Sequence, residues 1–250
     1  MNFPQGLIVS AQALEGNPFR NSEALALMAE AAMLGGAVAL RANGAEDISA
    51  MRRRVSIPII GIDKQKDGFG RTVITPTFEG AKRIWEAGAS IIALDATFYP
   101  SDIAEERRTL IERIHEELGI AVMADISTLE EAVAAAEMGA DAVSTTLAGY
   151  VPGALHSADE LYVPDFTLLS QIVAAGLPCK VVAEGRVWGG EDLKEAFHIG
   201  ADAVVIGKAI TNPMAITRYY TSFIPKGDDS ECIPTEAKEP RSDKITASSK

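Results

Sequence analysis

The stretch CKVVAEGRVWGGEDLKEAFHIGADAVVIG, residues 179–207, contains one complete unit of the pattern that decides the fold. It begins with an apolar run of strand length at 181–183, which a charged residue, Glu184, ends. A glycine-rich turn follows, and then a segment with helical spacing that closes in Gly-Ala, as helices commonly do. A second apolar run occupies 202–207. A strand, a helix and a further strand in this order predict two parallel strands joined by a helical crossover.

The same unit recurs along the chain. The apolar runs are GLIVSA (6–11), AVALRA (37–42), IPIIGI (57–62), SIIALDA (90–96), IAVMADI (120–126), DAVSTTL (141–147), CKVVAEG (179–185) and DAVVIG (202–207). Segments rich in strong helix formers separate many of them. Eight apolar strands alternating with amphipathic helices predict an α/β fold, a closed (β/α)₈ or TIM barrel. An open, doubly wound sheet is the alternative, but no GxGxxG follows the first run and the count exceeds five or six.

The barrel is expected to form a single domain over residues 1–224. The final segment, 225–250, is polar, mixed in charge and rich in Pro, Ser and Lys. Such a composition does not bury enough apolar surface to order a chain, so we expect a disordered tail there.

Composition and charge restrict the class of partner. The chain has 47% hydrophobic residues and a formal net charge of −12, which repels nucleic acid and anionic membrane surfaces. No window approaches the length of a membrane span and the N-terminus lacks a signal-peptide pattern, so we expect a cytoplasmic protein. Its two cysteines and three histidines have no metal-ligand spacing, and we expect no metal site. The outer helices of the barrel favour a homodimer.

Polar residues follow the predicted strands at the end where barrel enzymes place their active sites. They are Gln12, Arg41, Asn43, Lys64, Asp95, Thr97, Asp125, Ser127, Thr145, Thr146, Glu184, Arg186 and Lys208. A single charge at such a position is as readily a paired rim residue as a catalytic group. A lysine, several acids and arginines around one mouth, however, shift one another's pKa values. The set favours proton-transfer or imine chemistry over redox chemistry.

The loops after the last two runs favour a phosphate site. In (β/α)₈ barrels these loops commonly hold phosphate through backbone N–H groups. Here they contain Gly185, Arg186, Gly207 and Lys208, where the glycines allow close approach and the cations add charge. Plain turns are the alternative interpretation.

The ordered series of strand-end motifs resembles a known family. It comprises LIVSAQAL, ALRANG, PIIGIDK, IALDAT, MADIST, VSTTLAGY, VAEGR and GKAIT, from about residue 6 to about residue 223. The series is similar to bacterial N-acetylmannosamine-6-phosphate 2-epimerases of sialic acid catabolism, which implies a barrel of the ribulose-phosphate-binding type. The implied enzyme is a cofactor-independent isomerase that interconverts N-acetylmannosamine 6-phosphate and N-acetylglucosamine 6-phosphate.

The resemblance also implies roles for individual residues. Its catalytic lysine and glutamate match Lys64 and Glu184. The implied sugar-binding residues are Gln12, Arg41 and Asp125, and the implied phosphate-binding residues are Gly185, Arg186 and Gly207. From their places at strand ends we add Thr97 to the substrate-binding candidates and Lys208 to the phosphate-binding ones. The last motif, GKAITNP, departs from the family's usual GSAITRP or GGAITRP at Lys208 and Asn212.

Two other functions remain open at this point. Some phosphate-binding barrels decarboxylate or cleave sugar phosphates with a D-x-K-x-x-D pattern, and here Lys64 and Asp67 supply K-x-x-D while Ile62 stands at the leading position. A sugar-phosphate-binding regulator without catalysis is the second alternative, because a fold does not fix a function.

Overall fold

The computed structural model describes residues 3–68, 70–98, 104–151 and 162–225. Within these ranges, eight parallel strands close into a barrel in the order β1-β10-β9-β8-β7-β6-β3-β2. They are β1 (Gly6–Ser10), β2 (Ala39–Asn43), β3 (Ile59–Ile62), β6 (Ile91–Asp95), β7 (Ala121–Asp125), β8 (Ala142–Ser144), β9 (Lys180–Glu184) and β10 (Ala203–Ile206). The predicted (β/α)₈ barrel is confirmed, and each of the eight apolar runs overlaps one of these strands.

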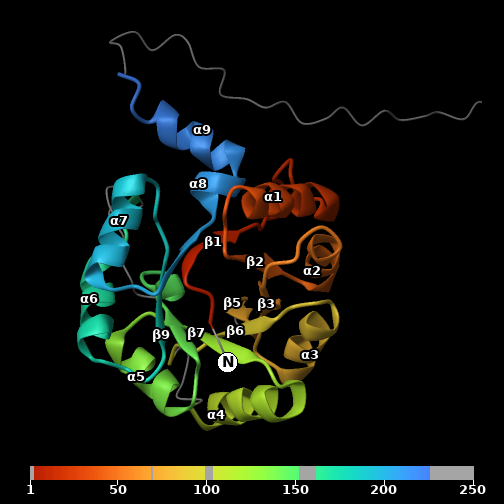
Figure 1. The fold of residues 1–250 in the computed structure, drawn as a ribbon, viewed down its shortest axis with the longest axis vertical. Helices are drawn as coiled ribbons and strands as arrows, with labels where there is room; N and C mark the ends of the chain where they lie inside the picture. Colours follow the sequence, from red (N-terminus) through yellow and green to blue (C-terminus); the bar gives the residue numbers. More distant parts are fainter. Residues whose placement is uncertain (1–2, 69, 99–103, 152–161, 226–250) are drawn as a thin grey trace, which may run out of the picture.

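Helices surround the strands, as Figure 1 shows. They are α1 (Ser22–Leu34), α2 (Ala45–Arg52), α3 (Phe78–Glu86), α4 (Ala104–Arg113), α5 (Leu129–Glu137), α6 (Phe166–Ala174), α7 (Gly190–Ile199), α8 (Lys208–Thr211) and α9 (Pro213–Thr221). A π-helical turn, Ile114–Leu118, continues α4. Side chains of Asn21, Thr77 and Thr128 accept hydrogen bonds from the first turns of α1, α3 and α5, which fixes where these helices begin. Helix α9 points away from the ring (Figure 1).

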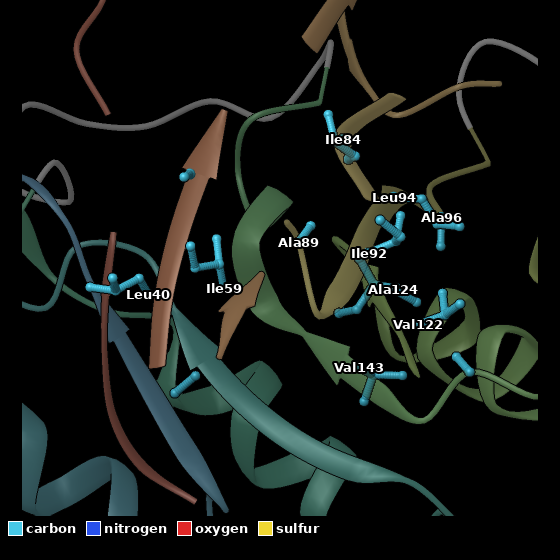
Figure 2. Close-up of a cluster of buried hydrophobic side chains, with 14 of the residues drawn as sticks. Leu40, Ile59, Ile84, Ala89, Ile92, Leu94, Ala96, Val122, Ala124 and Val143 are labelled. Carbon is cyan, nitrogen blue, oxygen red and sulfur yellow. The ribbon is translucent and has the colours of Figure 1, made fainter. Parts of the chain in front are cut away.

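Alternation along the strands separates two apolar layers. Outward-facing residues such as Leu40, Ile92 and Val122 pack beneath the helices, where α3 adds Ile84 (Figure 2). Inward-facing residues such as Met123 and Val182 belong to a second cluster inside the barrel. Because side chains alternate with a period of two, each inward-facing series continues toward the carboxyl end of its strand. At that end the series becomes polar, and this polar layer is the mouth of the barrel.

The outward face of β3 tolerates no side chain at Gly61. A Cβ added there would lie 2.6 Å from the Cβ of Ala89, which Figure 2 shows in the same apolar layer. We therefore expect Gly61→Ala to lower the free energy of unfolding by about 1–3 kcal/mol, because the packed layer must shift. Urea denaturation measures this effect. Gly68→Ala is the control, since its Cβ would meet nothing within 4 Å. An equal effect of both changes would contradict the packing argument.

Two segments differ from the sequence-based expectation. The sixth apolar run was expected to be a strand over 141–147, but β8 ends at Ser144 and residues Thr145–Leu147 form a 3-10 turn. The segment after β3 forms an antiparallel hairpin outside the barrel, β4 (Lys64–Lys66) with β5 (Thr72–Ile74), which the apolar pattern did not predict. Lys64 is thus the first residue of a hairpin strand and not the end of a barrel strand.

Some expectations fall outside the described residues. The predicted tail beyond Pro225 lies there, as do His156 and Cys232. Within the ranges that the structure describes, none of the helices has both the length and the apolar character required to cross a membrane.

Candidate active site

A buried arginine organises the mouth of the barrel. Arg41, on β2, is 1% exposed and donates to both carboxylate oxygens of Asp125, over 3.1 Å and 2.5 Å. The same guanidinium donates to Glu184 and, over 3.0 Å, to the hydroxyl of Thr146. Two strands separate β2 from β7, which carries Asp125, and two separate it from β9, which carries Glu184. Arg41 therefore crosses the barrel and forms the floor of its mouth.

Lys64 approaches the mouth from another side. Its ammonium donates to Oε1 of Gln12 over 2.8 Å, and the Gln12 amide in turn donates to the Ser10 hydroxyl over 2.9 Å. The backbone N–H of Lys64 donates to Oδ1 of Asn43 over 2.9 Å. These contacts link the hairpin to the ends of β1 and β2, so that the position of the lysine is defined by its neighbours.

Lys64 and Glu184 stand on opposite sides of the ring. Lys64 closely follows β3, and Glu184 ends β9. Three strands lie between β3 and β9 in either direction around the closed barrel. A small molecule held in the mouth would therefore meet an amine on one side and a carboxyl group on the other.

The surroundings bring the pKa values of these two groups toward each other. The surrounding protein shields the Lys64 amine from water, which lowers its pKa, although part of the side chain reaches solvent. The positive charge of Arg41 lowers this pKa further. Glu184 and Asp125 partly oppose this shift. Burial raises the pKa of Glu184 and the charge of Asp125 adds to the rise, while Arg41 opposes it. Near neutral pH, the neutral form of the Lys64 amine and the protonated form of the Glu184 carboxyl group are therefore both more populated than in free amino acids.

Burial divides the predicted catalytic and sugar-binding residues into two groups. Lys64 is exposed, Gln12 is partly exposed, and the side chain of Glu184 is 15% exposed. Asp125 is 0% exposed and lies with Arg41 beneath them. In this structure Arg41 contacts the acid directly and Asp125 holds Arg41, and their contact with a substrate stays a prediction.

Thr97 lies in a different environment from the one expected. It is 0% exposed, and both its backbone N–H and its hydroxyl donate to Oδ1 of Asp95, over 3.0 Å and 2.6 Å. This placement gives Thr97 a structural partner and speaks against a substrate contact.

The loops after β9 and β10 lie side by side, because these strands are neighbours. Gly185 and Arg186 both have positive φ, 114° and 59°, so the chain turns sharply after Glu184. Arg186 donates from Nε to the carbonyl of Val163 over 2.7 Å and from Nη1 to that of Ala148 over 2.9 Å. Lys208 is exposed at the first residue of α8, directly after Gly207.

Two polar residues outside the predicted catalytic and sugar-binding set complete the site. The Thr146 hydroxyl lies 2.6 Å from Asp125 Oδ1 and 3.1 Å from Glu184 Oε2. The Ser144 hydroxyl lies 2.8 Å from the Thr146 hydroxyl. The alternation of side chains along a strand could have identified Ser144 from the sequence, because it is the next inward-facing residue after Ala142 on β8. The K-x-x-D pattern gains no support, since Asp67 pairs with Arg71 in the hairpin.

No three histidine, cysteine, aspartate or glutamate side chains come together as a metal site in the part of the chain that the structure describes. The mouth of the barrel offers general acid and base groups. The fold and the mouth together define a class of protein, a (β/α)₈-barrel enzyme equipped for proton transfer.

Sequence comparison then identifies the family. The profile of the family described as "Putative N-acetylmannosamine-6-phosphate epimerase" matches residues 25–226. A relative with the corresponding 2-epimerase description, from Caldanaerobacter subterraneus subsp. tengcongensis, is 46% identical over 222 residues, covering 88% of this chain and 91% of its own. Another, from Clostridioides difficile, is 42% identical over 218 residues, covering 87% and 95%. The chain belongs to this epimerase family.

Solved structures agree with this assignment. That of the N-acetylmannosamine-6-phosphate 2-epimerase from Clostridium perfringens superposes with a TM-score of 0.80 at 40% identity, covering 87% of this chain and 93% of the other. A thiamine phosphate pyrophosphorylase from Pyrococcus furiosus gives a TM-score of 0.56 at 16% identity, covering 86% and 90%, and shows the shared fold alone.

Proposed function

We propose that this protein interconverts N-acetylmannosamine 6-phosphate and N-acetylglucosamine 6-phosphate by moving the proton on C2. Membership of the family and similarity to the 2-epimerase from Clostridium perfringens support the substrate. The placement of Lys64 and Glu184 on opposite sides of the ring carries the mechanism. Epimerisation requires a proton to leave one face of a carbon and another proton to arrive on the opposite face.

The chemistry needs the open-chain sugar. The C2–H bond becomes acidic only when C1 is a carbonyl, because the electron pair of that bond then moves to the carbonyl oxygen as an enolate forms. In one direction neutral Lys64 takes the C2 proton and protonated Glu184 delivers a proton to C2 from the other side. The C1 carbonyl accepts the electrons, so this route calls for no cofactor. In the reverse direction the two residues exchange roles.

Buried residues hold the Glu184 carboxyl group in a fixed position. Arg41, itself held by Asp125, fixes the Glu184 carboxyl group at the floor of the mouth, and Thr146 bonds to it from the turn after β8. Gln12 restrains the Lys64 amine. Such restraint favours reaction because the groups need not be reoriented during each turnover.

We propose that the phosphate binds at the loops after β9 and β10. Gly185 and Gly207 leave room for its close approach, and Arg186 and Lys208 supply positive charge. Binding energy from this end holds the sugar chain while C2 reacts at the centre. We further propose a cytoplasmic location, where sugar phosphates are formed and used.

A deuterium experiment tests the function. The enzyme, treated with a chelator, is incubated with N-acetylmannosamine 6-phosphate in deuterated water and followed by NMR. The gluco epimer with deuterium at C2 is the expected product. Binding without turnover would support the regulator, and bond cleavage or release of carbon dioxide would support the lyase. Either result would overturn the proposal.

The pH dependence follows from the two shifted groups. The pair works with one proton between them, so activity falls at low pH, where both are protonated, and at high pH, where both have lost their protons. We expect a bell-shaped profile of kcat/KM whose alkaline limb lies below pH 10.5, the ordinary pKa of lysine, because the pKa of Lys64 is lowered. The alkaline limb is the informative one, since the substrate phosphate ionises at about pH 6. A limb at or above 10.5 would contradict this assignment.

We also propose that the protein forms a homodimer through α9. This helix has no buried residue, and Tyr220 on it and Phe223, two residues beyond its end, are each 66% exposed. A second copy of the same helix offers a self-complementary apolar surface, as two-fold symmetry requires. Light scattering after gel filtration is expected to give a dimer for the wild type and a monomer for Phe223→Asp. Leu34→Asp, at a 79% exposed site on α1, is the control and should remain dimeric. A monomeric wild type would refute the dimer.

A further inference from the structure

The hairpin that carries Lys64 is a separate element attached to the barrel. Lys64 pairs with Ile74, and Lys66 pairs with Thr72, in a two-stranded sheet that shares no strand with the barrel. An isolated two-stranded hairpin is marginally stable in water. The position of the Lys64 amine therefore depends on the contacts that hold this hairpin against the mouth.

The base of the hairpin is fixed by Thr75. Its backbone N–H donates to the Asp63 carbonyl over 2.9 Å, and its hydroxyl accepts from the Asp63 N–H over 3.0 Å. The same hydroxyl donates to the carbonyl of Ala93 on β6 over 2.6 Å. Thr75 has φ of 46°, unusual for a β-branched residue, which indicates that its surroundings impose this conformation. These bonds hold the base of the hairpin on both of its strands.

The far end of the hairpin is held by an ion pair. Arg71 reaches Oδ2 of Asp95 over 3.2 Å, and Asp95 has a side chain only 1% exposed. The carboxylate of Asp67 accepts from the backbone N–H of Arg71 over 2.8 Å, and the Asp67 N–H donates to the Arg71 carbonyl over 2.9 Å. The turn is therefore shaped so that the Arg71 side chain extends toward β6, the strand adjacent to β3.

Asp95 is a fixed anchor for this contact. Its other carboxylate oxygen, Oδ1, accepts the two hydrogen bonds from Thr97. Arg107, on α4, donates to its backbone carbonyl over 2.9 Å. Asp95 ends β6, level with Asp125 on β7. Arg71 thus connects the hairpin to Asp95, a residue that Thr97 and Arg107 hold in place and that lies beside Asp125.

We propose that the Arg71–Asp95 pair is a positioning device that holds the Lys64 amine at the reacting carbon. The kinetic test of this inference rests on the proposed function. Arg71 and Asp95 would affect the reaction indirectly, by positioning Lys64. A buried ion pair is weak evidence for stability alone, whereas it fixes geometry through its direction and distance. Misplacement of a catalytic group by about 1 Å can cost about 10²-fold in rate.

The test compares Arg71→Gln, Asp95→Asn and the double variant with the wild-type protein. Arg54→Gln is the matched control, because Arg54 forms ion pairs with Glu23 and Glu30 on α1, away from the hairpin. We expect each single variant to lose about 10- to 100-fold in kcat with KM changed less than about threefold. The double variant is expected to be no worse than the single ones, since the two residues act as one unit. Arg71→Lys, which keeps the charge, should recover part of kcat.

A second readout follows Lys64 without turnover. Acetylation by acetic anhydride, resolved by peptide mass spectrometry across pH, reports the reactivity and pKa of this one amine. In Arg71→Gln the released hairpin exposes the amine to water, so its pKa is expected to rise toward the ordinary lysine value. The Arg54→Gln profile should match the wild type.

Each outcome decides the matter. Wild-type kcat and an unchanged Lys64 profile in Arg71→Gln would overturn the proposal. Lower thermal stability with normal kcat and an unchanged Lys64 profile would also overturn it, because the pair would then be purely structural. If the wild type lacks epimerase activity, the proposed function fails, and the acetylation profile still tests whether the pair positions Lys64.

Discussion

Glu184→Gln is expected to lower the rate of interconversion by about 10²–10⁴-fold while leaving exchange of the C2 proton with solvent for one epimer only. Glutamine keeps the size of the side chain and removes its transferable proton. Lys64 still removes and returns a proton on its own face of the substrate. The epimer whose C2 hydrogen points to Lys64 therefore takes up deuterium without changing configuration, and the other epimer does not.

Lys64→Met is the complementary variant. It leaves Glu184 as the remaining base, so exchange is expected only in the opposite epimer. Each purified epimer is incubated separately in deuterated water and C2 is followed by NMR. Glu191→Gln, at a side chain that is 90% exposed, is the control for the change of charge. If one of the two catalytic variants loses exchange in both epimers, a single base serves both faces and the assignment of two bases is wrong.

Arg41→Met is expected to have the largest effect on stability, a loss of about 3–5 kcal/mol in the free energy of unfolding at neutral pH. The substitution removes the positive charge that compensates Asp125, which is 0% exposed, and Glu184 beside it. Urea denaturation measures the loss. The penalty should shrink as the pH falls, because burial raises the pKa of Glu184 and its buried charge disappears when it takes up a proton.

The control for this loss is the same substitution on the surface. Arg54→Met removes an arginine that also pairs with two carboxylates, Glu23 and Glu30, but their side chains are 56% and 37% exposed. Exposed pairs contribute about 0–1 kcal/mol, so a small effect is expected. Adding Asp125→Asn to Arg41→Met should restore part of the stability. An Arg41→Met protein within about 1 kcal/mol of the wild type would contradict the proposed role of the floor.

The barrel could be predicted from the sequence because its strands are continuous apolar runs. The hairpin could not be predicted, since KQKDGFGRTVI is short and polar and only the turn residues Asp67, Gly68 and Gly70 indicate it. DAVSTTL was expected to be one strand because its pattern stays compatible with β structure. The chain nevertheless leaves the barrel at Thr145 in a 3-10 turn, where the Thr145 hydroxyl bonds to the backbone of Glu184.

The residues of the candidate site could be predicted from the sequence, but their arrangement in space could not. Strand-end position was enough to select Arg41, Asp125 and Glu184. Their mutual contacts join strands far apart in sequence, and no local pattern encodes which carboxylate an arginine will meet. Thr97 illustrates the same limit, because a residue two positions after Asp95 turns back to bond to it. Burial at that point depends on the neighbouring Asp95 network, which only the folded chain assembles.

The separate attachment of Lys64 has a consequence for redesign of the enzyme. The acid belongs to a barrel strand and is bonded to Arg41 of β2 and to the turn after β8, so its position is inseparable from the fold. The base belongs to a hairpin whose two described strands pair with each other and with no strand of the barrel. The described residues of this hairpin, 65–68 and 70–73, therefore lie outside the hydrogen-bonded ladders of the barrel. Changing their number or sequence would alter the reach of the amine, and with it the sugars that can be epimerised, while every hydrogen-bonded ladder of the barrel is retained.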